Sequence, residues 1–144
     1  MDVKTENEKK KELLMSYQKF LRRKRQILDE IQELRASKMF PSVINDGMPH
    51  GSNQTDLSNY IVSLSEKQEE LKHVQLEVEK AKQKVYLTIK QVNDDEREIL
   101  QYRYIDGLKW DDVQRKMGFN NLRRIYKIHS NALKNIRLAK QYKM

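Results

Sequence analysis

The fold of this 144-residue chain is decided by residues 93–136, which read NDDEREILQYRYIDGLKWDDVQRKMGFNNLRRIYKIHSNALKNI. Apolar residues recur there at helical spacing in three short runs, and Gly107 and Gly118 separate the runs. From Asn121 to the C-terminus the chain has seven Lys and Arg residues and no Asp or Glu. A last helix of this kind is typical of a helix-turn-helix that presents one basic face to a polyanion.

The sequence predicts how the first of these helices begins and ends. Asn93 and Glu96 fit a capping box, in which the Asn93 side chain accepts from a backbone amide and Glu96 reaches back to the cap residue. Asp106 and Gly107 then end the helix, because glycine tolerates the left-handed backbone of a helix stop.

Two further helices follow in this prediction. Residues 110–117 form a short one that contains the only tryptophan, and Gly118 supplies the turn after it. The last helix runs from Leu122 to about Lys140, with Asn120 or Asn121 as its N-cap. Its expected buried side consists of Ile125, Ile128, Ala132, Leu133 and Ile136.

Two longer helical patterns precede this region. The first runs from Glu6 to Ser37 and has a seam of side chains three and four residues apart, namely Leu13, Tyr17, Phe20, Lys24, Ile27, Ile31 and Leu34. Leu14, Leu21 and Leu28 widen that seam at sevenfold spacing. The second runs from Asp56, its expected N-cap, to Val92. Its seam consists of Leu57, Tyr60, Leu64, Lys67, Leu71, Val74, Val78, Ala81, Val85, Thr88 and Val92.

Residues 38–55 connect the two long patterns and hold both prolines and two of the four glycines, so a loop is expected there. The apolar residues of this loop suggest that it packs back on the helices. The expected fold is therefore all-α. Residues 1–92 form a long antiparallel helical hairpin that resembles a coiled coil and dimerises, and residues 93–144 form a three-helix helix-turn-helix domain.

Composition narrows the classes of function. The net charge of +8 and the pI near 9.6 indicate an anionic partner. Residues 93–144 carry 12 Lys and Arg against 7 Asp and Glu, so most of the excess positive charge lies in this segment. The chain has no cysteine, its three histidines lack metal-ligand spacing, and no nucleophile or phosphate-loop motif occurs. We therefore expect a cytoplasmic binding protein that has no enzymatic activity, cofactor, metal, membrane contact or small-molecule substrate.

The predicted contact residues lie on the last helix. Arg123, Lys127, Ser130 and Lys134 share one face at helical spacing, opposite the apolar face. Arginine can pair with guanine edges and lysine can anchor phosphate. The full set of expected double-stranded DNA contacts is Asn121, Arg123, Arg124, Tyr126, Lys127, Ser130 and Lys134.

A resemblance supports this prediction. Residues 93–136 resemble region four of bacterial sigma factors, through Glu96-Arg97, Arg103-Tyr104, Gly107, the short middle helix, the glycine turn and Ala132-Leu133. The chain is also similar to the RinA-type and ArpU-type late transcription regulators of Gram-positive phages and prophages. The matching segments are DGMPHGS at residues 46–52 and DLSNY at residues 56–60. Where the pattern usually has a small residue in the middle helix, this chain has Gln114.

The resemblance implies a phage or prophage transcription regulator that activates late genes in the host bacterial cytoplasm. Two alternatives remain open. The first is an interaction protein that binds host RNA polymerase without strong DNA specificity. The second is a DNA-packaging recognition subunit like a small terminase. This alternative predicts a ring of subunits, whereas the regulator hypothesis predicts a homodimer.

Overall fold

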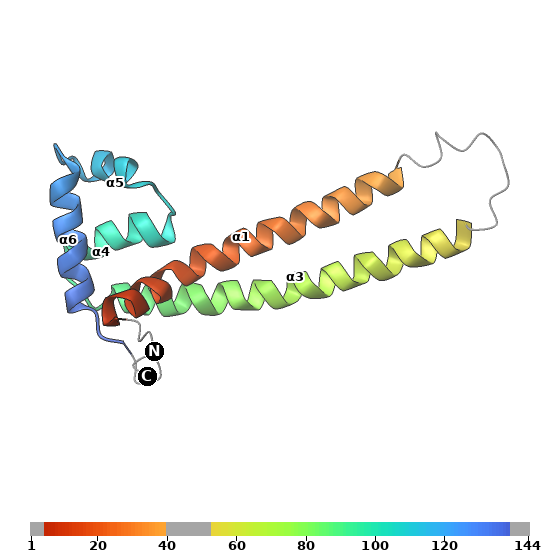
Figure 1. Cartoon of the computed structure of the whole chain (residues 1–144), viewed down its shortest axis with the longest axis horizontal. Helices are drawn as coiled ribbons and strands as arrows, with labels where there is room; N and C mark the ends of the chain where they lie inside the picture. Colours follow the sequence, from red (N-terminus) through yellow and green to blue (C-terminus); the bar gives the residue numbers. More distant parts are fainter. Residues whose placement is uncertain (1–4, 40–52, 139–144) are drawn as a thin grey trace. The chain divides into compact units, whose positions relative to one another are not determined.

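The computed structural model describes residues 5–39 and 53–138, and every regular element in these two ranges is helical (Figure 1). The elements are α1 (Glu6–Met39), α3 (Asn53–Ile89), α4 (Asp94–Leu100), the π-helix η1 (Gln101–Ile105), α5 (Trp110–Met117) and α6 (Leu122–Asn135). The all-α class is confirmed for these residues. In the described ranges, no helix combines the length and apolar character that a bilayer crossing requires.

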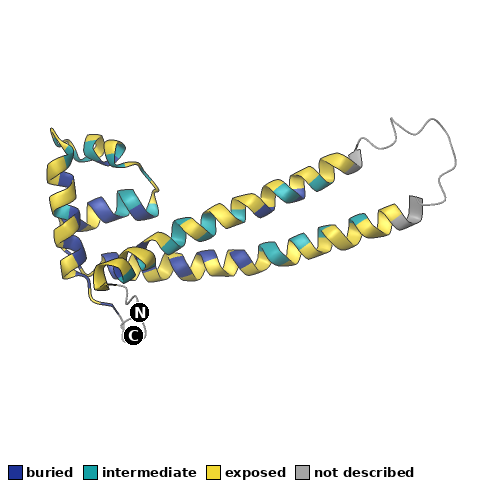
Figure 2. Ribbon diagram, viewed as in Figure 1, coloured by how far each residue is buried: buried dark blue, intermediate teal, exposed yellow. Residues whose placement is uncertain are grey.

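The two long helices pack together through the seam that the sequence predicted. All predicted seam residues of both helices are buried or half-buried, with the exception of Leu57 (Figure 2). Burial at every third and fourth residue is what two packed helices require, since only one stripe of each can face the other.

The packing divides the chain into two units. One unit comprises Met1–Phe20 and Val78–Met144, and the other comprises Leu21–Glu77. The first unit therefore combines the beginning of α1 and the end of α3 with the C-terminal helices, so packing does not divide the chain between residues 92 and 93. The expected assignment of residues 1–92 to oligomerisation and of residues 93–144 to DNA binding stays a prediction about function.

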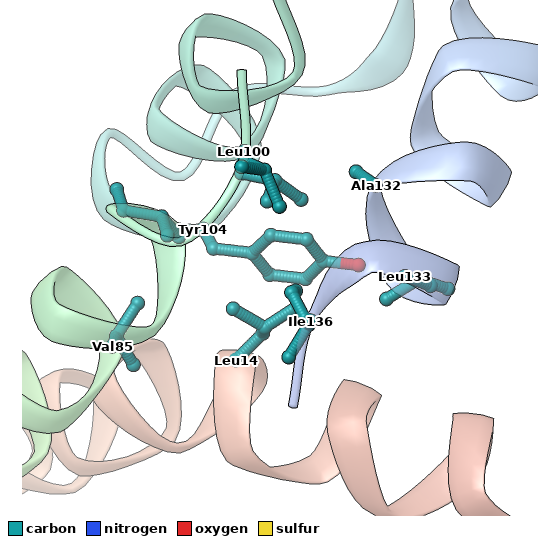
Figure 3. Packing of buried hydrophobic residues seen from close by; sticks show 9 residues of the cluster. Leu14, Val85, Leu100, Tyr104, Ala132, Leu133 and Ile136 are labelled. Carbon is teal, nitrogen blue, oxygen red and sulfur yellow. The ribbon is translucent and has the colours of Figure 1, made fainter. Parts of the chain in front are cut away.

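The unit of Met1–Phe20 and Val78–Met144 has a core to which five helices contribute, namely α1, α3, α4, η1 and α6. Leu14 of α1, Val85 of α3, Tyr104 of η1 and Leu133 of α6 meet in it (Figure 3). The other buried members of this cluster are Ile89, Val92, Leu100, Ala132 and Ile136. A second cluster consists of Ile99 of α4, Val113 of α5 and Ile125 of α6. Both clusters share α4 and α6, so these two helices hold the C-terminal part together.

Several predicted helix ends were wrong. Asp56 lies in the first turn of α3 instead of capping it, and α3 ends at Ile89, three residues before Val92. The predicted loop 38–55 was too long, because residues 38–39 belong to α1 and residues 53–55 belong to α3. Residues 40–52 lie outside the described residues, and so does the expectation that the loop packs back on the helices. Helix α6 ends at Asn135, because Ile136 turns to extended backbone and buries its side chain in the core.

The capping box is confirmed in one half only. The Asn93 side chain accepts from the Glu96 amide at 2.9 Å, but the Glu96 carboxylate does not return to Asn93. Both carboxylate oxygens accept from the side-chain amide of Asn135, at 3.0 and 3.1 Å. Glu96 therefore links the start of α4 to the end of α6. Helix α4 then passes into η1, whose Asp106 amide bonds to the carbonyl of Gln101, a spacing that the sequence pattern did not predict.

Candidate nucleic-acid interface

The turn between α5 and α6 is fixed by local hydrogen bonds. Gly118 adopts a left-handed conformation with φ of 73°, which ends α5 as predicted. The Gln114 side chain donates to the carbonyl of Phe119 at 3.1 Å, so the larger residue at this position braces the turn. Asn121 caps α6 by accepting from the Arg124 amide at 3.2 Å. The predicted Asn121 contact with DNA therefore involves a side chain whose oxygen already serves as the cap.

The basic face of α6 is exposed as predicted. The side chains of Arg123, Lys127, Ser130 and Lys134 are all exposed, while Ile125, Ala132 and Leu133 on the opposite side are buried. Arg124 and Tyr126 are also exposed and flank the first two of these residues along the helix. The structure thus leaves six of the predicted contact side chains accessible on one 14-residue helix that contains no acidic residue. We call Arg123, Lys127, Ser130 and Lys134 the basic face of α6.

Ring contacts orient the two flanking residues. The Tyr126 ring meets Trp110 edge to face, with 5.6 Å between centroids, and the Arg124 guanidinium lies 4.4 Å from the centroid of the Phe119 ring. The Arg103 guanidinium lies over the Trp110 ring, 4.5 Å from its centroid. Such aromatic and cation–π contacts restrict side-chain rotamers, so Tyr126 and Arg124 are held in place at the beginning of α6.

A buried histidine lies under the same helix. The Nε2 atom of His129 is 2.7 Å from the hydroxyl of Tyr104, and the His129 ring also packs against Trp110 at 4.9 Å. Burial lowers the pKa of His129 to about 4, with Lys11 and Arg103 adding to the effect, and burial raises the pKa of Tyr104 to about 12. A neutral imidazole next to a protonated phenol is therefore the state at neutral pH. His129 belongs to the support of α6, not to its exposed face.

Residues far away in the sequence fix the end of α6. The ammonium group of Lys10, which is 4% exposed, donates to the carbonyl of Leu133 at 2.7 Å. Gln91 and Arg137 exchange two hydrogen bonds, one to the Arg137 carbonyl at 3.2 Å and one from its amide at 2.9 Å. These bonds occupy groups that the helix end would otherwise leave unpaired. Sequence reasoning missed them, and the only available signal was the position of Lys10 three residues before Leu13 of the seam.

Within the described residues no group of three or more His, Asp or Glu side chains could hold a metal ion. Searches against protein-family models, curated proteins and solved structures found no match for this chain.

Proposed function

We propose that this chain is a sequence-specific DNA-binding transcription regulator whose helices α5 and α6 act as a helix-turn-helix. The observation that carries the proposal is the exposed basic face of α6, with an apolar opposite side anchored in two core clusters. A recognition helix needs this combination, since it must be held rigidly from behind and present hydrogen-bond donors in front.

The chemistry of the face suits a duplex. Arg123 and Arg124 can donate to guanine edges, Lys127 and Lys134 can neutralise phosphates, and the Tyr126 ring can contact a thymine methyl group. The N-terminal end of α6 carries the positive end of the helix dipole next to these residues. The function is binding, and no enzymatic step is part of the proposal.

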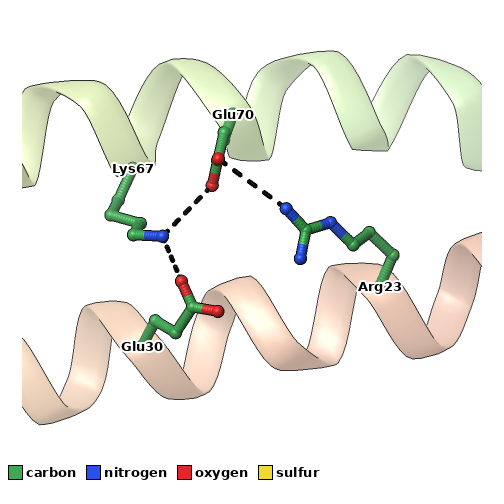
Figure 4. Close-up of polar contacts among 4 residues, drawn as sticks. All are labelled: Arg23, Glu30, Lys67 and Glu70. Atoms are coloured by element: carbon green, nitrogen blue, oxygen red, sulfur yellow. Dashed lines mark hydrogen bonds and ion pairs between the residues drawn. The ribbon is translucent and has the colours of Figure 1, made fainter.

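We propose a role for the long helices as well, namely pairing two copies of the chain. We take them as an antiparallel hairpin, which agrees with ion pairs that join Arg23 to Glu70 and Glu30 to Lys67 (Figure 4). A hairpin that pairs two copies would place two recognition helices on one duplex. The resemblance to late regulators of Gram-positive phages supports a role in activating phage genes in the bacterial cytoplasm, and it is the sole support for that part.

The test is a selection of bound duplexes from a random DNA library with the full chain. We expect one enriched motif and an affinity that falls steeply as salt rises, because phosphate contacts release counterions. No enriched motif, together with an affinity that is insensitive to salt, would contradict the proposal. Salt-dependent binding without a motif would instead favour the polymerase-binding alternative, in which DNA specificity is weak.

A further inference from the structure

We propose that the ring of Phe119 positions the Arg124 guanidinium so that Arg124 reads one guanine base in the major groove. This inference rests on the proposed function and deepens it, because it names the base that one residue of the candidate recognition helix selects. It makes Arg124 a residue that reads sequence. Phe119 is then a positioning residue, which acts through Arg124 and need not touch DNA.

Arg124 is held at two points in the chain without DNA. Its backbone amide donates to the Asn121 side chain at 3.2 Å, which places Arg124 in the first turn of α6. Its guanidinium carbon lies over the Phe119 ring, 4.4 Å from the ring centroid. The exposed side chains of Arg123 and Lys127 make no hydrogen bond, ion pair or ring contact with any residue that the structure describes. Arg124 therefore begins from a more restricted position than these two neighbours.

Phe119 is itself fixed by the turn between α5 and α6. Its amide donates to the Gln114 carbonyl at 3.2 Å, and its carbonyl accepts from the Gln114 side chain at 3.1 Å. The side chain of Phe119 packs against the second cluster, which contains Val113 and Ile125. Backbone bonds and core packing thus hold the ring from behind, as a supporting residue requires. The long side chain of Gln114 contributes directly, because it reaches the carbonyl of the residue that supports Arg124.

The chemistry of Arg124 selects guanine. Its contact with the ring involves the positive charge and no hydrogen-bond acceptor, so the five N–H donors of the guanidinium remain available. Two of these donors match the adjacent O6 and N7 acceptors that guanine presents in the major groove. Residues in the first turn of a recognition helix are the ones that contact base edges. A guanidinium that is already positioned also loses less rotamer freedom when it binds, which favours the correct base.

Two substitutions of Phe119 separate the ring from its packing. Phe119→Tyr keeps a ring under the guanidinium, whereas Phe119→Leu keeps an apolar side chain without a ring. The probes are the duplex that selection with the full chain enriches and each single-base-pair variant of it, titrated at fixed salt. We expect one G·C pair whose replacement weakens binding of wild type and Phe119→Tyr by about tenfold or more, and leaves Arg124→Ala unaffected. Phe119→Leu should lose roughly two- to tenfold of the discrimination at that pair alone.

Arg124→Lys tests the base contact without altering the turn. It keeps the charge and loses the paired planar donors, so the preference for the G·C pair should disappear while the salt dependence of binding remains. This variant carries the test if Phe119→Leu unfolds, which circular dichroism would show. A preference that survives in Arg124→Lys, or an Arg124→Ala variant that weakens binding to all duplexes equally, would overturn the inference in favour of a phosphate contact.

A double-mutant cycle distinguishes positioning from general damage to the turn. Phe119→Leu should weaken binding to the enriched duplex on its own and have no further effect in the Arg124→Ala background. The Lys127→Ala background is the matched control, and there the effect of Phe119→Leu should add in full. Additive effects in both backgrounds would overturn the role of Phe119. A selection that enriches no motif would contradict the proposed function itself, and these other failures leave that function standing.

Discussion

Lys10 and Leu133 are 123 residues apart in the sequence, and a 2.7 Å hydrogen bond joins the ammonium group of the first to the backbone carbonyl of the second. The bond ties the beginning of α1 to the last turn of α6, where the helix dipole is negative and carbonyls lack helical partners. The position of the candidate recognition helix therefore depends on the N-terminal helix of the chain.

Replacing Lys10 with Met keeps much of the side-chain volume and removes the donor. We expect the free energy of unfolding to fall by about 1.5–3 kcal/mol, because a charge-assisted hydrogen bond is lost and the Leu133 carbonyl remains buried. Urea denaturation measures the change. The neighbouring Lys11 is exposed, so Lys11→Met should change stability by less than about 0.5 kcal/mol. Equal losses in the two variants would show that the bond is unimportant.

Asn135→Ala removes the donor that serves both oxygens of Glu96, a residue that is 5% exposed. A buried carboxylate would lose its side-chain partner, so we expect destabilisation by about 1–3 kcal/mol. Asn131→Ala, an exposed position on the same helix, serves as the control and should be nearly neutral. Thermal unfolding of the two variants measures the difference. A melting temperature of Asn135→Ala equal to that of wild type would refute the stabilising role of Asn135.

The stability of the fold should depend on pH through His129. Its pKa is lowered from 6.5 to about 4 in the folded chain, so the unfolded chain binds more protons between these values. Stability is therefore lost as pH falls below about 6.5, and the loss is complete below about 4. The shift corresponds to a loss on the order of 3 kcal/mol.

Urea denaturation between pH 7 and pH 4 tests this expectation. His129→Gln cannot take up the proton, so it should lose less stability over that interval than wild type. The exposed His73 provides the control, and His73→Gln should follow wild type. Parallel curves for wild type and His129→Gln would show that the imidazole is not the titrating group.

The two positive-φ glycines should respond differently to alanine. Both Gly107 and Gly118 sit near φ of 72°–73°, so each substitution strains the backbone by about 1 kcal/mol. A Cβ at Gly107 would also lie 3.0 Å from Oε1 of Gln18, whose side-chain amide donates to the carbonyl of Ile105 at 2.8 Å. Nothing lies within 4 Å of a Cβ at Gly118. Gly107→Ala should therefore have the lower melting temperature, and equal melting temperatures would argue against the Gln18 contact.

Periodicity and capping predicted much of this fold. Spacing of three and four residues located the seams of α1 and α3, since only one stripe of each can be buried. Local chemistry located Asn93 as the cap of α4 and Gly118 as the residue that ends α5, because these signals lie within one turn of the helix end that they mark. The exposed face of α6 followed in the same way from the opposition of charged and apolar residues.

Most of the interactions that were not predicted join residues far apart in sequence. Glu96 had a plausible local partner in Asn93, and only the packed structure shows that Asn135 is its partner. Lys10 contacts a carbonyl 123 residues away, and the spacing of residues around Lys10 does not identify that partner. His129 contacts the Tyr104 hydroxyl and the Trp110 ring, and its position in the sequence identifies neither partner. Periodicity reports which side of a helix is buried, but it does not report what the buried side meets.

The most direct test of the central claim is the affinity of Arg123→Ala and Lys127→Ala for the duplex that selection enriches, measured by fluorescence anisotropy at fixed salt. Arg25→Ala and Lys82→Ala remove the same charges from exposed positions on α1 and α3 and serve as controls. We predict that each α6 variant loses about 1–3 kcal/mol of binding free energy, while helix content and the controls stay unchanged. Variants at Arg123 and Lys127 that bind as tightly as their controls would contradict the assignment of α6 as the recognition helix.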